Sequence, residues 1–262
     1  MIELLQPSWP TPKGVSIAFT TRRQKGLTGS RATDAGSATD TDYGDANLGL
    51  HVGDHPASVV ANRLQLLNQL TGAQSIQWLN QTHGTDCLLA SAPTVLDADA
   101  CYTAEPGMAC AVMTADCLPV LFACQGGAGV SKSDHAKVAA AHAGWRGLAN
   151  GVLENTLSRF ADPANVVAYL GPAIGPQQFE VGPDVRAAFA AAPDDLFTPG
   201  QGDRLYANIY GLARWVLTQQ GVKQVYAYDG CTVSEPDTFY SYRRNSQTGR
   251  QASVIWFNDS SR

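Results

Sequence analysis

The chain has 262 residues, 44% of them hydrophobic and 16% charged, and a formal net charge of −5 at pH 7. This composition is typical of a globular protein that buries a sizeable core without a disulfide or a metal, and it argues against disorder. The acidic balance argues against a nucleic-acid or anionic-membrane partner, which would need a basic surface, so a small-molecule ligand is expected.

The first predicted element is a strand at 14–22. The segment after it, 23–46, is rich in Gly, Ser, Thr and Asp and is predicted to be a mobile surface loop, because it cannot bury much apolar area. A helix is predicted over 54–72, with Asp54 as its N-cap. The buried face of this helix is expected to carry Val60, Leu64 and Leu67.

Short apolar runs bounded by turn residues predict the remaining strands. They lie at 75–80, 86–90, 109–115, 119–124, 137–143, 165–171, 224–230 and 252–257. Pro119 is expected to break the ladder at the start of its run. Helices are predicted at 147–161 and 205–221, with a short one at 182–192. The apolar face of the second helix is expected to carry Leu205, Ile209, Leu212 and Val216.

The interspersed strands and helices, without an internal repeat or a linker, predict a single α+β domain over 1–262 in which helices cover a sheet system. The stretch MIELLQPSWPTPKG has neither the basic nor the apolar region of a signal peptide, and no stretch of about 18 apolar residues follows. We therefore expect a cytoplasmic protein without a membrane partner. A monomer or a weak homo-oligomer is expected.

Three side chains stand out because each lies beside an apolar run and next to residues that favour the approach of a ligand. His83 in NQTHGTD and His142 in AAHAGWRG are followed by Gly or Ala-Gly, and Cys117 in VMTADCLPVLF lies between two apolar runs. Two imidazoles and one thiolate suit a zinc ion with an open fourth position, as a catalytic site requires. From the pattern alone, three unrelated buried residues remain the alternative.

The remaining cysteines and histidines favour structural or surface roles. The six cysteines contain no CxxC pair, so most are expected to be reduced, and Cys110 and Cys124 lie in apolar runs that favour burial. His55 and His135 are expected on the surface. His51 in NLGLHVGD either lines a pocket or is structural.

Six motifs occur in the order found in one known family. They are NLGLHVGDHPASVVANRLQL, NQTHG, MTADCLPVLF, AAHAGWRGL, YLGPAIGPQQFEVGPDV and FYSYRRNSQTGR. From about residue 14 to its C-terminus the chain resembles the bacterial polyphenol-oxidase-like, laccase-domain proteins. These proteins are described as purine nucleoside phosphorylases with adenosine deaminase side activity, and in some bacteria as peptidoglycan editing factors. The polar segment after FTTR is longer than the short glycine-rich turn of the family.

The resemblance implies a layered α/β sandwich and a metal site of one Cys and two His, which fall on Cys117, His83 and His142. It also implies purine nucleosides and phosphate as substrates. The preferred hypothesis is accordingly a zinc enzyme that cleaves adenosine, inosine or methylthioadenosine with phosphate and deaminates adenosine more slowly.

Residues beside these ligands are candidates for substrate contacts. Arg146 follows Trp145 at a predicted helix start, where free N–H groups favour anions, so it is expected to contact phosphate or ribose unless it is a surface or capping residue. Asn47 in NLGLH either offers its amide to a purine or sugar or stabilises a turn. Trp145 either stacks on a purine or belongs to the core.

Three further residues each have two possible roles. Asp116 is structural if its strand is regular, or a general base if the chain turns it toward a pocket. Arg243 and Arg244 either close the site or are solvated.

Two other functions compete with the zinc enzyme. Without a metal, Cys117 as nucleophile and His142 or His83 as base would give an amide hydrolase suited to editing of cell-wall precursors. Copper is the alternative metal, but a blue-copper oxidase would need a weak axial methionine, and neither Met108 nor Met113 lies in a suitable loop. Metal content discriminates these readings.

Overall fold

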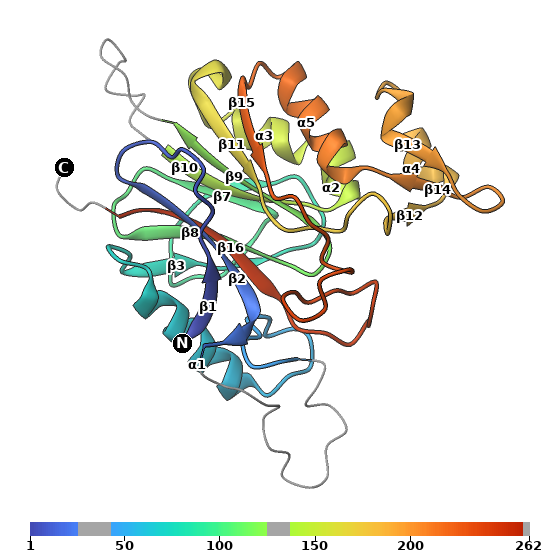
Figure 1. The fold of residues 1–262 in the computed structure, drawn as a ribbon. Helices are drawn as coiled ribbons and strands as arrows, with labels where there is room; N and C mark the ends of the chain where they lie inside the picture. The colour runs from blue at the N-terminus through green and yellow to red at the C-terminus, as the bar shows by residue number, and fades with distance from the viewer. Residues whose placement is uncertain (26–42, 125–136, 259–262) are drawn as a thin grey trace, which may run out of the picture.

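Two β-sheets packed face to face form the centre of the molecule, and helices cover both outer faces (Figure 1). The computed structural model describes residues 1–25, 43–124 and 137–258. Its mixed sheets with interspersed helices confirm the predicted α+β fold and its layers.

The strands form two large and two small sheets. The five-stranded sheet has the order β1 (Ile2–Leu5), β2 (Val15–Gln24), β16 (Gln251–Phe257), β8 (Met108–Thr114) and β3 (Ser75–Gln77). The six-stranded sheet has the order β15 (Gln224–Ala227), β11 (Val166–Leu170), β9 (Leu118–Cys124), β10 (Lys137–Ala143), β7 (Ala100–Thr103) and β5 (Cys87–Leu89). The small sheets are β12 (Glu180–Val181), β14 (Leu205–Ala207) and β13 (Phe197–Pro199), and β4 (Leu79–Asn80) with β6 (Leu96–Asp97).

The helices lie on either side of this pair of large sheets. They are α1 (Pro56–Gln69), α2 (Trp145–Asn150), α3 (Val152–Leu157), α4 (Pro183–Ala188) and α5 (Ile209–Gln219). Helix α1 covers the five-stranded sheet, whereas α2, α3 and α5 pack on the six-stranded sheet. The order of layers is therefore helix, sheet, sheet, helix.

Alternation along the strands explains this layering. In β9, Val120 and Phe122 pack in the core shared with the helices, whereas Leu121 and Ala123 face the other sheet. Because successive side chains of a strand point to opposite faces, a strand that is apolar at every position is buried on both. The continuous apolar runs of the sequence therefore mark strands in the middle of the sandwich.

Helix α1 forms as predicted, but of the three residues expected on its buried face only Leu67 packs against the core. Val60 and Leu64 are 47% and 58% exposed, and the buried positions are Val59, Asn62 and Leu66. The polar Asn62 turns inward because its amide donates to the backbone of residue 47 and its side-chain oxygen accepts from Gln24. His55 rather than Asp54 is the N-cap and makes no side-chain cap bond.

The predicted helix at 147–161 is two helices, and the first of them begins two residues earlier, at Trp145. Gly151 lies between α2 and α3 and caps both helices. Its φ of 101° is a backbone conformation that an L-residue rarely adopts. The predicted helix at 205–221 is also too long. Leu205 belongs to β14, and Asn208 caps α5 by accepting the N–H of Gly211, so the helix begins at Ile209.

Several boundaries also differ from the sequence prediction. The run at 75–80 divides between two sheets as β3 and β4, and α4 ends before the expected end of 182–192. Pro119 lies within β9, opposite His142, and does not break the strand. Cys110 is buried as predicted, whereas Cys124, at the end of β9, is partly exposed.

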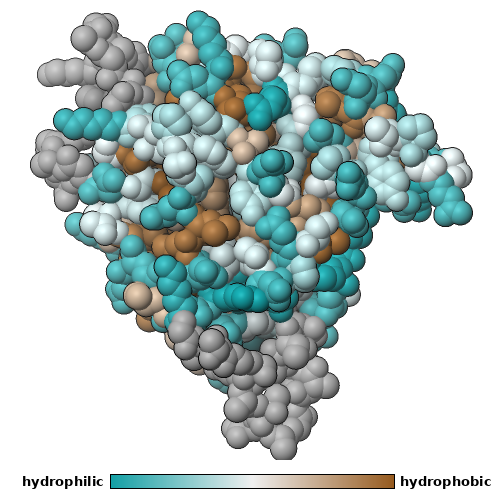
Figure 2. Space-filling model, in the orientation of Figure 1, coloured by the Kyte–Doolittle hydropathy of each residue, from teal (hydrophilic) through white to brown (hydrophobic). Residues whose placement is uncertain are grey.

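The face drawn in Figure 2 is mainly hydrophilic, with hydrophobic residues in separate patches. In the part of the chain that the structure describes, no helix is both long and apolar enough to cross a membrane.

Arg23 and Gln24, at the start of the predicted loop, belong to β2, and Tyr43 and Ala46 at its end are buried. The rest of that loop, 26–42, and His135 lie outside the described residues.

Candidate metal-binding active site

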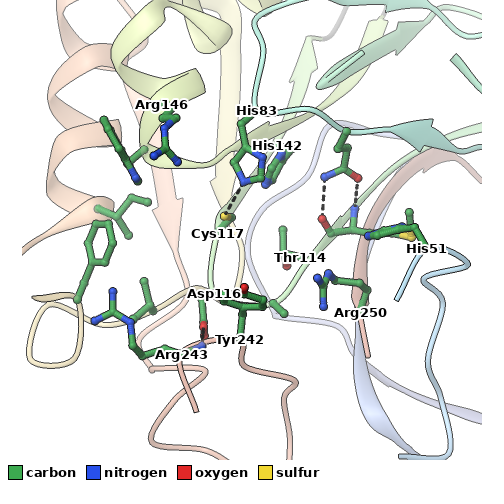
Figure 3. Close-up of a pocket in the computed structure, with 17 residues that line it drawn as sticks. His51, His83, Thr114, Asp116, Cys117, His142, Arg146, Tyr242, Arg243 and Arg250 are labelled. Carbon is green, nitrogen blue, oxygen red and sulfur yellow. Dashed lines mark hydrogen bonds between the residues drawn. The ribbon is translucent and has the colours of Figure 1, made fainter. Parts of the chain in front are cut away.

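Three donor side chains converge beside a cavity of about 540 Å³. His83 lies between β4 and β5, Cys117 between β8 and β9, and His142 near the end of β10. Their ligand atoms all lie within 4.8 Å of one another, and Sγ of Cys117 is 3.7 Å from Nε2 of His83 (Figure 3). The structure thus brings together the three residues singled out in the sequence.

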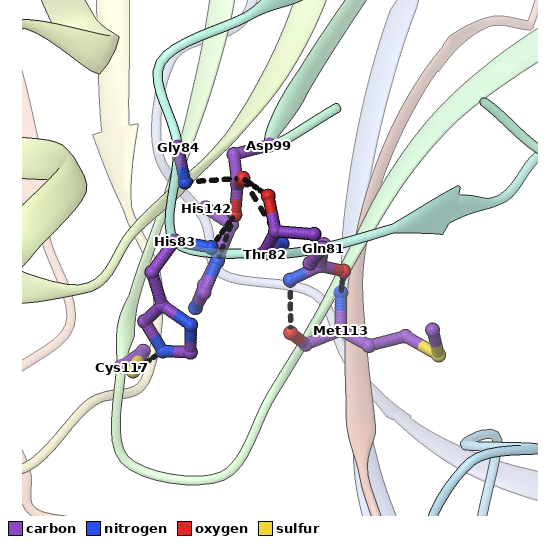
Figure 4. Close-up of polar contacts among 8 residues, drawn as sticks. All are labelled: Gln81, Thr82, His83, Gly84, Asp99, Met113, Cys117 and His142. Atoms are coloured by element: carbon purple, nitrogen blue, oxygen red, sulfur yellow. Dashed lines mark hydrogen bonds and ion pairs between the residues drawn. The ribbon is translucent and has the colours of Figure 1, made fainter. Parts of the chain in front are cut away.

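Asp99 holds two of these ligands in place (Figure 4). Its buried carboxylate accepts the backbone N–H groups of Thr82, His83 and Gly84 at 3.1, 2.9 and 2.6 Å. It also accepts Nδ1–H of His142 at 2.8 Å. His83 has a φ of 62°, a strained conformation that persists only where surrounding bonds fix it. Asp99 therefore fixes the backbone of His83 and leaves Nε2 of His142 free for a metal.

Asp116 shapes the turn that presents Cys117. Its φ is 89°, and its buried carboxylate accepts bonds from Thr232 Oγ1 at 2.6 Å, Ser241 Oγ at 3.0 Å and the backbone N–H of Arg243 at 2.6 Å. These bonds tie the turn to the C-terminal part of the chain. The arrangement favours the structural reading of Asp116 over a general base.

Gly144, the residue between β10 and α2, makes room for the ligands. A Cβ there would lie 2.7 Å from Cδ2 of His83 and 3.2 Å from Sγ of Cys117. Contacts this short would force the ligands to move. The small residues noted around His142 in the sequence are thus a steric requirement at this position.

The ionised forms of Cys117, His142 and Asp99 stabilise one another. Desolvation would raise the pKa of Cys117, but the rings of His142 and His83 outweigh it and bring this pKa to about 6. Desolvation likewise would lower the pKa of His142, yet Cys117 and Asp99 raise it to about 9. For Asp99, burial opposes ionisation, while His142 and the backbone N–H groups hold the pKa at about 2. A thiolate beside an imidazolium is therefore the favoured metal-free state near pH 7.

The donor set fits zinc. Two imidazole nitrogens and one thiolate sulfur within reach of one ion, with one ring oriented by a carboxylate, are typical of catalytic zinc sites. Met113 is the methionine that lines the cavity, and its sulfur points away from the cluster and accepts a bond from Arg63 at 3.5 Å. Met113 is therefore not placed as the axial ligand of a blue-copper centre.

The walls of the cavity combine cationic, aromatic and apolar side chains (Figure 3). Its cationic and imidazole residues besides the ligands are Arg146, Arg243, Arg250 and His51. Its aromatic residues are Trp145, Phe179 and Tyr242, and its aliphatic ones include Ile174 and Ile209. Such walls suit a ligand with a flat ring and an anionic group.

Arg146 and Trp145 line the cavity from the start of α2. The guanidinium of Arg146 lies over the ring of Trp145, 4.5 Å from its centroid, and Arg146 is exposed. Helix α2 has only six residues, so its end adds little to the attraction of an anion.

Asn47 does not line the cavity. It is fully buried, and its Oδ1 accepts the backbone N–H groups of Gly49 and Arg250 at 2.9 and 2.8 Å. Its amide donates to Asp54 at 2.9 Å. Asn47 therefore does not contact a ligand in the cavity, but it fixes the backbone of Arg250, which lines the cavity.

Arg243 lines the cavity and Arg244 does not. The guanidinium of Arg243 donates to the backbone of Gln178 and Glu180, and Arg244 donates to the backbone of residues 232, 233 and 239. His51 lines the cavity, as one of its two readings predicted, and His55 is exposed.

The sequence analysis did not single out several residues of the site, among them Asp99, Thr114, Tyr242 and Arg250. Asp99 gave one usable signal, a carboxylate just before an apolar run in LDADACYT. Thr114, Tyr242 and Arg250 gave none apart from their place in long motifs, because exposed or strand-end residues of these types are common.

Known proteins similar to this chain cover nearly all of it. The family described as multi-copper polyphenol oxidoreductase laccase matches residues 28–258. The purine nucleoside phosphorylase YfiH of Escherichia coli (strain K12) is 47% identical over 98% of this chain and 99% of the relative. The purine nucleoside phosphorylase PA4543 of Pseudomonas aeruginosa is 44% identical over 97% and 98%.

Solved structures are similar in fold over the same length. The Neisseria meningitidis protein NMB0706 has a TM-score of 0.83 and 43% identity, with 98% of this chain and 99% of that chain covered. YlmD from Geobacillus stearothermophilus has a TM-score of 0.80 and 27% identity, with 98% and 96% covered.

Proposed function

This chain belongs to the multi-copper polyphenol oxidoreductase laccase family. From its site and from its relatives we propose that it is a zinc-dependent purine nucleoside phosphorylase with adenosine deaminase side activity. The observation that carries the proposal is the cluster of His83, Cys117 and His142 beside a cavity with cationic and aromatic walls. The names of its relatives, which are purine nucleoside phosphorylases, support the same reaction class.

His83, Cys117 and His142 would hold the zinc, and copper is the alternative ion. Zinc bound there would supply Lewis-acid polarisation of an oxygen and would lower the pKa of bound water to about 7. The chain itself orients His83 and His142 through Asp99, and the three residues that would hold the ion line the cavity in which a substrate would lie.

The remaining cavity residues would bind and position the nucleoside. Trp145 and Phe179 offer aromatic faces for the purine, and Arg146 would contact ribose or phosphate. Asn47 would act by holding Arg250. In phosphorolysis an oxygen of hydrogen phosphate forms a bond to C1′ as the C1′–N9 bond breaks. The electron pair of the broken bond stays on the purine, and the proton that the phosphate hydroxyl loses is taken up by a purine ring nitrogen.

The experiment is to purify the protein without a chelator, measure its metal by mass spectrometry, and incubate it with adenosine, inosine and methylthioadenosine. With phosphate, adenosine should yield adenine and ribose 1-phosphate, and without phosphate slow formation of inosine should remain. Cys117→Ala should remove the metal and both products. Cys110→Ala, the matched control in the core, should lose stability and keep the metal. Loss of one product alone in a ligand variant would contradict a shared site.

A second candidate rests on the thiolate. Cys117, with a pKa of about 6 and His83 at 3.7 Å, resembles an activated nucleophile, which would give a Cys-His amide hydrolase for cell-wall precursors. This function predicts activity in metal-free protein, whereas the zinc phosphorylase predicts none.

A further inference from the structure

Arg250 presents a charge to the cavity without a carboxylate partner. Its Nη1 donates to the backbone oxygens of Thr248 and Gly249 at 2.9 and 3.0 Å, which fixes the guanidinium. Among the described residues no ion pair includes Arg250, unlike Arg186, which pairs with Asp194 at 2.6 Å. Because Nε and Nη2 have no acceptor within the described part of the chain, one fork of the side chain remains available to a ligand.

Thr114 lies next to Arg250 on the same wall. The β8–β16 ladder pairs Thr114 with Gln251, the residue after Arg250. Thr114 is 2% exposed, lines the cavity, and its Oγ1 has no hydrogen-bond partner in the described structure. A buried hydroxyl without a partner is unfavourable, so a ligand that accepts its hydrogen bond would remove that cost.

The surroundings of this wall favour an anion. His51 lies on the same side of the cavity in Figure 3. Arg63, which does not line the cavity, lies over the ring of Trp78 and donates to the sulfur of Met113, a residue of the cavity wall. Burial, and then the charges of Arg250 and Arg63, lower the pKa of His51. The carboxylate of Asp116, which also lines the cavity, already accepts three hydrogen bonds.

Arg146, on the opposite side of the ligand cluster, is less suited to hold an anion (Figure 3). It is exposed and lies over Trp145, so water already screens its charge. A fixed, partly buried guanidinium binds a tetrahedral oxyanion more strongly than an exposed one, because less side-chain freedom is lost and less water screens the contact.

We propose that Arg250 and Thr114 form the subsite for inorganic phosphate, across the metal cluster from Arg146. The inference rests on the proposed phosphorolysis for the identity of the oxyanion. Arg250 would donate from Nε and Nη2 to two phosphate oxygens, and Thr114 would donate from Oγ1 to another. Arg146 is then left for the ribose.

The test is calorimetric titration of inorganic phosphate into the full-length protein, both zinc-loaded and metal-free, since phosphate could also bind zinc directly. Arg250→Met should weaken phosphate binding at least about tenfold in both forms. Thr114→Val should weaken it by about threefold or more without lowering Tm, because the lost hydroxyl has no protein partner. Arg146→Met and the distant control Arg214→Met should stay within about twofold of wild type.

Unchanged phosphate affinity in both Arg250→Met and Thr114→Val would overturn the subsite, as would a loss confined to Arg146→Met. Thr114→Val keeps the test decisive if Arg250→Met fails to fold. The proposed function fails separately: a wild-type protein that binds phosphate through Arg250 but releases no purine would keep the subsite and lose the reaction. Phosphorolysis with an unchanged KM for phosphate in Arg250→Met would keep the reaction and overturn the subsite.

Discussion

At the scale of single residues, Gly144 leaves the space that the ligand cluster needs. Gly144→Ala would place a Cβ 2.7 Å from the ring of His83, so the ring must move away from Cys117. We expect zinc affinity to fall at least about tenfold while the fold is kept. Competition with a chelating dye measures this. Gly182→Ala, whose Cβ would meet only the ends of the Asp184 and Arg204 side chains, is the control and should keep wild-type affinity.

Asp99 offers a second prediction at this scale. Asp99→Asn keeps the shape of the side chain but replaces one acceptor oxygen by a donor, which cannot accept the N–H groups now directed at it. Zinc affinity should fall about 10- to 100-fold. Asp97→Asn, at an exposed carboxylate two residues away, should leave the affinity unchanged. Equal losses in the two variants would contradict the role given to Asp99.

The charges of the cluster predict how zinc binding depends on pH. Near pH 7 Cys117, with a pKa of about 6, is already a thiolate, whereas His142, with a pKa of about 9, must lose a proton to bind. Zinc binding should therefore release about one proton, and affinity should rise about tenfold per pH unit between these pKa values. Calorimetry in buffers of different ionisation enthalpy counts the protons. A zinc affinity that does not change with pH over this range would contradict these charges.

How much of the site the sequence predicts depends on the kind of residue. His83, Cys117 and His142 were predictable because donors of their type are rare in this chain and lie beside small residues. Their convergence followed only from the resemblance to a known family, because it depends on strand order, which the residue pattern does not give. Asp99 acts through backbone N–H groups, and Arg250 through a neighbouring strand, and neither relation leaves a local pattern.

At the scale of elements, Gly151 separates α2 from α3. Gly151→Ala would force an alanine to φ near 101° or distort the junction, so the free energy of unfolding should fall by about 1–2 kcal/mol. Asn tolerates a positive φ better than Ala does, so the free energy of unfolding should fall less in Gly151→Asn than in Gly151→Ala. Urea unfolding of both variants measures whether Gly151→Asn is the more stable of the two. Equal stability of Gly151→Ala and wild type would mean that the junction adapts.

Element types were predicted more reliably than element ends. The strand at 137–143 coincides with β10, because its apolar run has clear boundaries. Two of the three residues predicted for the buried face of α1, and the predicted start of α5, were wrong because hydrogen bonds of Asn62 and Asn208 outweigh the apolar pattern. Strands of two to four residues are too short to show alternation.

At the scale of the whole molecule, both large sheets contribute to one core. Ile17 and Ile255 from one sheet share a cluster with Leu121 and Val138 from the other, so neither sheet buries its inner face alone. We therefore predict one calorimetric unfolding transition for the whole chain. Zinc at about 100 times its dissociation constant should add about 2.7 kcal/mol, and Cys117→Ala should abolish this increment. Two separate transitions would contradict a single domain.

The connection between β8 and β9 passes from one large sheet to the other within residues 115–117. Thr114 ends the strand on one side of this passage, and Cys117 precedes the strand on the other. A ligand that contacts both residues would bridge the seam between the layers and oppose any shear of one sheet past its neighbour. A bound ligand would then increase the resistance of the two large sheets to sliding past each other.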